Sequence, residues 1–175
     1  FFCSSITIGC AQENSPTIET PTTSNYTYET VVDGINIPWG MAFINEKELL
    51  VTEVSGTLYH VQDGNKTAIE GLPDIYARGQ GGLLDVALHP DFKNNSILYM
   101  TLAATLDGDA GGNTSLYKAK LVDKHLEEVS LLYKATPNTK KGQHFGSRIA
   151  FDNEGHVYFS VGDRGNRDEN PQDIT

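Results

Sequence analysis

The sequence lacks the features that define several common protein classes. Among its 175 residues the only cysteines are Cys3 and Cys10, so the rest of the chain cannot carry a disulfide framework. Beyond the first ten residues, no apolar run is long enough for a transmembrane helix. Lys and Arg number 13 against 23 Asp and Glu, a net charge of −10 that argues against nucleic acid or an anionic membrane surface as partner. Long helical patterns are scarce, and a Gly- and Tyr-rich acidic chain fits a soluble β protein.

The first ten residues, FFCSSITIGC, resemble the end of an export signal that has lost its basic start. Gly9-Cys10 resembles a bacterial lipobox, in which the cysteine is lipidated, although Thr7 stands where leucine is usual. An ordinary cleaved signal and a Cys3–Cys10 disulfide are the alternatives. All three predict export to the periplasm or cell envelope, and a lipid anchor at Cys10 is the one predicted membrane contact. Because the chain begins with Phe1 rather than Met, we expect the N-terminal part of a longer protein.

Three segments follow from composition. Residues 1–10 are the leader, residues 11–28 form a polar flexible linker, and residues 29–175 form a domain. Within the domain, short runs rich in Val, Ile, Leu, Tyr and Thr are bounded by Gly, Asn, Asp or Pro, which predicts strands. The predicted strands are 48–53, 56–62, 83–88, 96–102, 114–121, 130–134, 148–151 and 156–161, and 123–128 is long enough only for a helical turn.

An internal repeat indicates the architecture. The motifs GMAF, DVAL and RIAF each place an alanine between apolar residues, at Ala42, Ala87 and Ala150, and each is followed by a polar turn and a second apolar strand. The alanines lie 45 and 63 residues apart, and an interval of about 40–50 residues is typical of a four-stranded propeller blade. The longer interval is explained by loops at 106–113 and 136–144.

The repeat therefore predicts an all-β fold, a β-propeller of which this chain covers two blades and the start of a third. A β-sandwich would not produce the repeated strand pair. Propellers have about four to eight blades, so these blades cannot close a ring, and this again indicates a partial chain.

In a propeller, the loops that enter the innermost strands meet at one mouth of the central channel. The alanine alignment places Gln80 opposite Gln143 in two such loops, and His144 follows directly. An imidazole can accept a proton near neutral pH, and Asp163, which follows the next strand, could orient the ring. Judged by spacing alone, a histidine in a loop is more often a surface or turn residue than a base.

The remaining histidines carry no functional prediction: His89 supports a turn, His60 and His156 lie in strands, and His125 lies in a polar loop. No spacing indicates a zinc site, a phosphate-binding loop or a Ser/His/Asp triad. The acidic turn at 107–109 is too short for a calcium loop, so no metal ligand is predicted.

Together the motifs resemble the glucose/sorbosone dehydrogenase family, which includes soluble PQQ-dependent glucose dehydrogenases and periplasmic aldose sugar dehydrogenases, the latter being the more similar branch. The stretches that carry the resemblance are PWGMAF, LLVTE, GQGGLLDVALHPDF, GGNTSLYKAKL and HFGSRIAFDNEGHVYFSVGDRG. They extend from about Val31 to the end of the chain, and their combination is specific.

The resemblance implies a six-bladed propeller that binds PQQ over its channel with an activating calcium ion. His144 matches the family's catalytic histidine, which takes the proton of the anomeric hydroxyl while hydride passes to the quinone. Asp163 matches the acidic residue that supports it, and Gln80 matches a cavity glutamine. The product would be an aldonolactone, with the electrons passing to an external acceptor.

The sequence departs from the family pattern at Gln143, where soluble glucose dehydrogenases carry an acidic residue, so preference for glucose does not transfer. Gln172 matches another cavity glutamine only loosely. The family's calcium ligands and most PQQ contacts fall in later blades, so we expect this chain alone to be inactive.

Two other functions share the fold. A non-enzymatic binding propeller of the same family is the first, but it would not need His144, Asp163 and Gln80 together. A metal-dependent sugar lactonase is the second, but it would need carboxylate and Asn ligands where these loops offer Gln and His.

Overall fold

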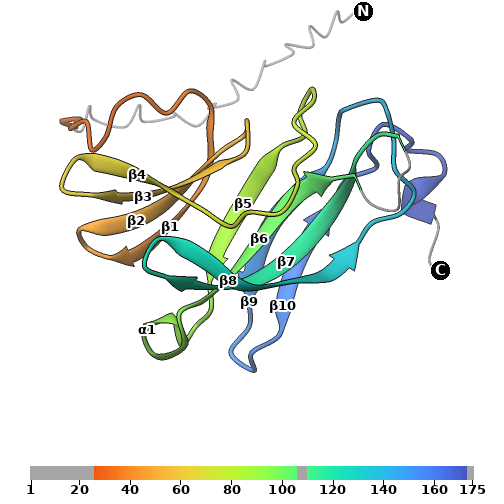
Figure 1. The fold of residues 1–175 in the computed structure, drawn as a ribbon. Helices are drawn as coiled ribbons and strands as arrows, with labels where there is room; N and C mark the ends of the chain where they lie inside the picture. The colour runs from red at the N-terminus through yellow and green to blue at the C-terminus, as the bar shows by residue number, and fades with distance from the viewer. Residues whose placement is uncertain (1–25, 106–109, 173–175) are drawn as a thin grey trace, which may run out of the picture.

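The computed structural model describes residues 26–105 and 110–172, which form three antiparallel sheets (Figure 1). The first contains β1 (Pro38–Asn45), β2 (Glu48–Glu53), β3 (Thr57–Gln62) and β4 (Asn65–Ile69). The second contains β5 (Leu83–Leu88), β6 (Ile97–Ala104), β7 (Asn113–Val122) and β8 (His125–Lys134), and the third contains β9 (Gly146–Phe151) and β10 (Val157–Val161). The helical segments in this part of the chain are α1 (Phe92–Asn95) and the 3-10 turn η1 (Asn170–Gln172), neither of them long enough to cross a membrane.

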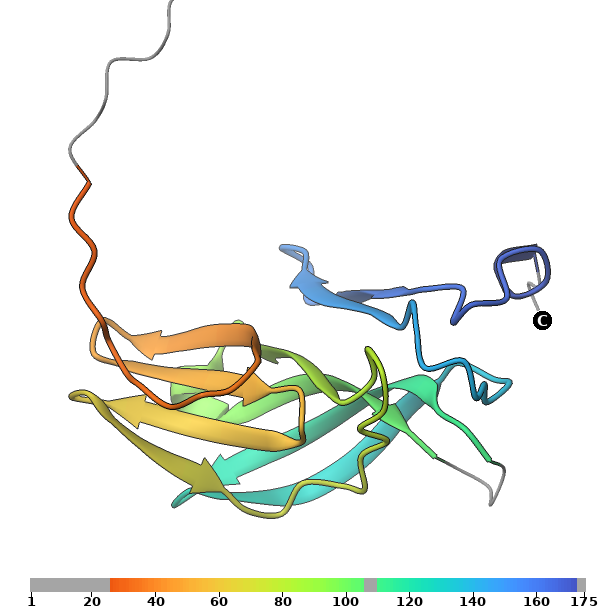
Figure 2. The same ribbon diagram turned by 90° about the horizontal axis from the view of Figure 1, so that it is seen from above.

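The strands follow the order predicted for propeller blades. In each sheet, strands that are consecutive in the sequence pair with each other. The first strand of the second sheet, β5, contacts the first strands of the other two sheets, β1 and β9. Seen from above, the sheets follow one another as separate layers, with the β9–β10 hairpin standing away from the outer strands of the second sheet (Figure 2). The all-β fold class, with two blades and the start of a third, is confirmed.

The core lies between the first two sheets and follows from the period-2 alternation of each strand. Leu50 of β2 and Leu58 of β3 are fully buried against Leu98 and Met100 of β6. The neighbours of Leu50 along β2 point to the other face of the sheet, where they pack under residues 32–35. Apolar side chains thus cover both faces of a blade.

Several local expectations are wrong. Residues 123–128 form no helical turn: Asp123 and Lys124, both with positive φ, make a tight hairpin turn, and His125 already belongs to β8. His156 lies in the turn before β10 rather than in a strand. The strand β4 was not predicted, because NKTAI carries only one buried side chain. The long alanine interval is due partly to β7 and β8, which have 10 residues each, and not to loops alone.

In each of the first two blades, a hydroxyl group on the second strand forms a hydrogen bond to the next blade. Thr52 Oγ1 accepts the Gly40 N–H at 2.8 Å and donates to Leu84 O of the next blade at 2.6 Å. Thr101 Oγ1 repeats the pattern, accepting the Asp85 N–H at 3.1 Å and donating to Ser147 O at 2.9 Å. Each hydroxyl lies opposite a register shift in the first strand of its blade, where an extra residue leaves backbone groups outside the ladder.

We expect Thr101→Val to lower the free energy of unfolding of the intact protein by about 1–3 kcal/mol, because Thr101 is fully buried and its loss leaves the Asp85 N–H and the Ser147 carbonyl without this partner. Urea unfolding measures the change. Thr67→Val, on the exposed face of β4, is the control and should change stability by less than about 0.5 kcal/mol. Equal effects of the two substitutions would contradict this role.

Candidate functional site

Two loops that enter successive blades meet at one rim of the sheets. The loop before β5 and the loop before β9 share the sequence Gly-Gln, at Gly79-Gln80 and Gly142-Gln143, and they touch through their backbones. The Gln80 N–H donates to Gly142 O at 2.8 Å. A Cβ on Gly79 would lie 2.2 Å from that same oxygen, so only glycine permits this approach. The contact brings Gln80 beside His144, 64 residues further along the chain.

His144 and Asp163 form a hydrogen-bonded pair at this rim. His144 Nδ1 lies 2.9 Å from Asp163 Oδ1, and the histidine side chain is 53% exposed whereas that of Asp163 is 21% exposed. An ionised carboxylate only accepts hydrogen bonds, so in the neutral imidazole Nδ1 carries the proton and Nε2 keeps its lone pair. The arrangement therefore leaves Nε2 as the ring nitrogen that can accept a proton, on a half-exposed side chain.

Asp163 is held as an anion by two donors on one oxygen. The Gly165 N–H donates to Oδ1 at 2.6 Å, and this bond, followed by that from His144, holds the pKa of Asp163 below its usual range. At neutral pH the carboxylate is thus charged. It can fix the tautomer of the imidazole and stabilise the imidazolium that forms when Nε2 takes up a proton.

The backbone of His144 has an unusual conformation. Its φ is +58°, in the left-handed region that costs a non-glycine residue about 1–2 kcal/mol. Both of its backbone polar groups are engaged: the N–H donates to Gln80 Oε1 at 2.8 Å, and the carbonyl accepts the Arg164 N–H at 2.9 Å. Gly162 makes room for this carbonyl, because a Cβ there would lie 1.9 Å from His144 O.

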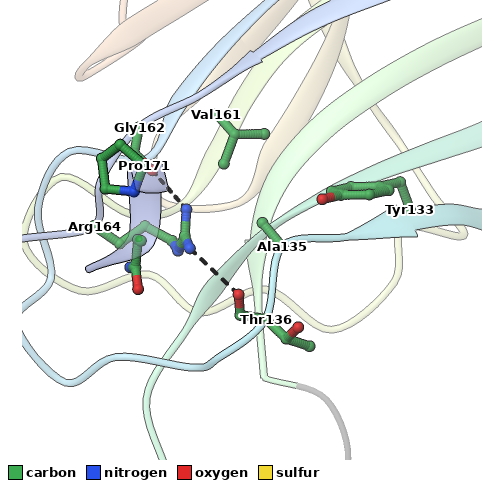
Figure 3. Close-up of a pocket in the computed structure, with 8 residues that line it drawn as sticks. Tyr133, Ala135, Thr136, Val161, Gly162, Arg164 and Pro171 are labelled. Carbon is green, nitrogen blue, oxygen red and sulfur yellow. Dashed lines mark hydrogen bonds between the residues drawn. The ribbon is translucent and has the colours of Figure 1, made fainter. Parts of the chain in front are cut away.

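Arg164 anchors the segment that carries Asp163. The residue is only 3% exposed, and the guanidinium donates to Gly162 O at 2.5 Å and to Thr136 O at 3.5 Å (Figure 3). Burial lowers the pKa of this guanidinium. A cavity of about 230 Å³ adjoins it, lined by Tyr133, Ala135, Thr136, Val161, Gly162, Arg164, Asn170 and Pro171. Thr136 follows β8, so the bond ties the Asp163 segment to the second blade.

The other two predicted site residues, Gln143 and Gln172, form no described hydrogen bond to His144 or Asp163. Gln143 is half-buried, and its side chain lies against Gly165. Gln172 ends η1, and its side chain lies outside the described part of the chain. Sequence reasoning missed Gly162 and the Arg164 N–H, because the stretch GDRG has the composition of an ordinary turn and gives no signal for either.

The polar groups at this rim suit a hydroxyl group better than a calcium ion. The bare imidazole Nε2 can accept a hydrogen bond from such a hydroxyl group. Among the described residues, Asp163 is the carboxylate beside His144, whereas calcium takes about six to eight oxygen ligands, so these residues do not form a calcium site. The one described trio of metal-ligating side chains, Asp152, Glu154 and His156, lies in the β9–β10 turn at the other end of β9.

The leader, the lipidation of Cys10 and most of the linker fall in residues 1–25, outside the described residues.

Comparison with known proteins places this chain in a family. Residues 35–175 match the family described as glucose / sorbosone dehydrogenase. The chain is 32% identical over 144 residues to the aldose sugar dehydrogenase YliI of Escherichia coli, covering 79% of this chain and 38% of that protein. It is 25% identical over 154 residues to quinoprotein glucose dehydrogenase B of Acinetobacter calcoaceticus, covering 81% of this chain and 31% of that enzyme.

Solved structures agree. The PQQ-bound aldose sugar dehydrogenase of Streptomyces coelicolor superimposes with a TM-score of 0.67 at 27% identity, covering 78% of this chain and 41% of that one. The apo-form E. coli aldose sugar dehydrogenase gives a TM-score of 0.73 at 31% identity, again over 78% and 41%. The chain thus spans less than half the length of these relatives.

Proposed function

Because the chain belongs to the glucose/sorbosone dehydrogenase family, we propose that the intact protein oxidises aldose sugars and that His144 accepts the proton that leaves the sugar. The observation that carries this proposal is the His144–Asp163 pair at 2.9 Å, with Nδ1 bound to the carboxylate and Nε2 left for substrate. A similar pair, His156 with Asp152, lies elsewhere on the chain, so it is the combination of His144, Asp163 and Gln80 at one rim that favours an enzyme over a binding propeller.

The proposed reaction needs one proton acceptor, and this chain supplies it. The anomeric hydroxyl gives its proton to His144 Nε2, the C1–H bond breaks with loss of hydride, and C1–O becomes the carbonyl of an aldonolactone. PQQ, when bound, would supply an electrophilic quinone carbonyl as the hydride acceptor, and the two electrons would later pass to an external acceptor. Asp163 stabilises the imidazolium while the proton is held.

The chain's own residues prepare the ring before substrate arrives. Asp163 selects the tautomer, and the bonds from Gln80 and Arg164 fix the backbone that carries the ring. Such preorganisation leaves little reorganisation for the reaction itself. We propose that Gln80 and Gln143 line the cavity that binds the sugar and the cofactor, and that Gln172 contacts this cavity from η1.

Calcium, which the resemblance implies, would have to take its ligands from outside the described residues. We therefore expect the 175-residue chain alone not to oxidise sugar.

The proposed location is the periplasm or cell envelope, with a lipid anchor at Cys10. Replacing Cys10 with serine and following detergent-phase partitioning of the intact protein tests the anchor: unchanged partitioning would reject it.

The test of function is a dye-linked assay of the intact protein with PQQ, calcium and a panel of aldoses. Dye reduction with at least one aldose, with lactone as the product, supports the proposal. Bound PQQ with no reduction by any sugar would reject it.

A further inference from the structure

One of the contacts that join the two blades at the site runs from a side chain to a backbone group. Gln80 Oε1 accepts the His144 N–H at 2.8 Å, and because an N–H can only donate, the carboxamide oxygen must be the end that faces His144. The Gln80 amide group then points away from His144. We propose that Gln80 is a positioning residue, which holds His144 in its left-handed conformation and thereby aims the ring at Asp163.

The need for such a holder follows from the strain at His144. A residue with φ of +58° persists only where its surroundings outweigh the cost. The Arg164 N–H donates to the His144 carbonyl. However, Arg164 also has a positive φ, +51°, and it lies on the same turn as Asp163, so this bond does not connect His144 to the other blade. Gln80 comes from the other blade and is the one described side chain that bonds the N–H side of His144.

Gln80 is itself fixed by the neighbouring blade. Its N–H donates to Gly142 O at 2.8 Å, and the next residue, Gly81, donates its N–H to Arg78 O at 3.0 Å. The glutamine therefore connects the two blades by two hydrogen bonds, one from its backbone N–H to Gly142 and one from the His144 N–H to its side chain. Any shift of one blade against the other would move the ring relative to Asp163.

If Gln80 positions His144, the length of the side chain and its acceptor oxygen matter at position 80, whereas the amide N–H groups do not. Gln80→Met keeps the length and removes the acceptor, and Gln80→Glu keeps both the length and an acceptor oxygen. A role as a direct sugar or cofactor contact would instead make both variants defective, chiefly in KM, because both lose the amide donors.

The experiment uses the intact protein and two readouts. The first is nitrogen NMR of labelled histidine, assigned with His144→Gln, which reports whether Nδ1 carries the proton and needs neither sugar nor PQQ. Gln80→Met should lose the single Nδ1–H form of His144, and Gln80→Glu should retain it. Gln62→Met, which removes an exposed glutamine on β3, is the control and should leave the spectrum unchanged.

The second readout rests on the proposed function. In the dye-linked assay, Gln80→Met should lower kcat about 10- to 100-fold with KM within about 2-fold, and Gln80→Glu should recover most of kcat. An unchanged His144 spectrum in Gln80→Met overturns the inference, as does an equal rise of KM in both variants. If the His144 spectrum changes as expected while wild type oxidises no sugar, the positioning role stands and the proposed function fails.

Discussion

Replacing Asp163 with asparagine is expected to lower kcat of the intact protein about 100- to 10,000-fold. The asparagine has nearly the same shape but carries no charge. Its carbonyl oxygen can still accept the Gly165 N–H and the His144 Nδ1–H, which share one oxygen of Asp163 in the wild type. The imidazolium that forms when Nε2 takes up a proton then loses its anionic partner, and proton transfer from the sugar slows. Steady-state dye reduction with a saturating aldose measures the loss.

The chain offers a matched control for this substitution. His156 and Asp152 form a similar pair, with Nδ1 and Oδ2 2.8 Å apart, in the turn at the far end of β9. Asp152→Asn changes the same chemical group in the same kind of pair, and it should leave kcat within about 2-fold of wild type because that turn lies at the end of β9 away from His144. If the two variants lose activity equally, the effect is structural and Asp163 has no special role.

Replacing Gly162 with alanine is expected to damage both stability and activity. The new Cβ would lie 1.9 Å from His144 O and 3.0 Å from Gly146 N, so the His144 carbonyl must move and its bond from Arg164 must break. We expect the free energy of unfolding to fall by about 1–3 kcal/mol. Because the ring moves with its backbone, kcat should fall about 100-fold.

Gly155→Ala separates this clash from the general cost of replacing glycine. Gly155 has a φ of +89°, but a Cβ there would meet nothing within 4 Å, so alanine costs about 1 kcal/mol in conformation and encounters no obstacle. Thermal unfolding and dye reduction of both variants form the test. Wild-type kcat in Gly162→Ala would show that the His144 carbonyl need not be held in place.

The repeat predicted the blades because it depends on burial, which sequence patterns report directly. Ala42, Ala87 and Ala150 lie on the first strands of three successive sheets, and the apolar strands that follow them pair as expected. The hydroxyl ties were not predicted. Thr52 and Thr101 hold the same register in their blades, but hairpins of different length precede them, so no fixed spacing in the sequence marks them.

The site was predictable in its members but not in its contacts. Alignment of the two Gly-Gln loops indicated that Gln80 and His144 share one rim. The left-handed backbone of His144 could not be foreseen, because positive φ is uncommon in non-glycine residues, and its enrichment in histidine does not mark a particular position. Without it, the bond from the His144 N–H to Gln80 and the demand for glycine at Gly162 could not be foreseen either.

The most direct test of the proposed chemistry is a single turnover without an external acceptor. Intact protein loaded with PQQ and calcium is mixed anaerobically with an aldose, and reduction of the bound quinone is followed by absorbance in wild type and in His144→Gln. We predict that wild type reduces the quinone and forms one lactone per site, and that His144→Gln binds PQQ equally but reacts about 100- to 10,000-fold more slowly. Equal rates in the two proteins would contradict the assignment of His144 as the proton acceptor.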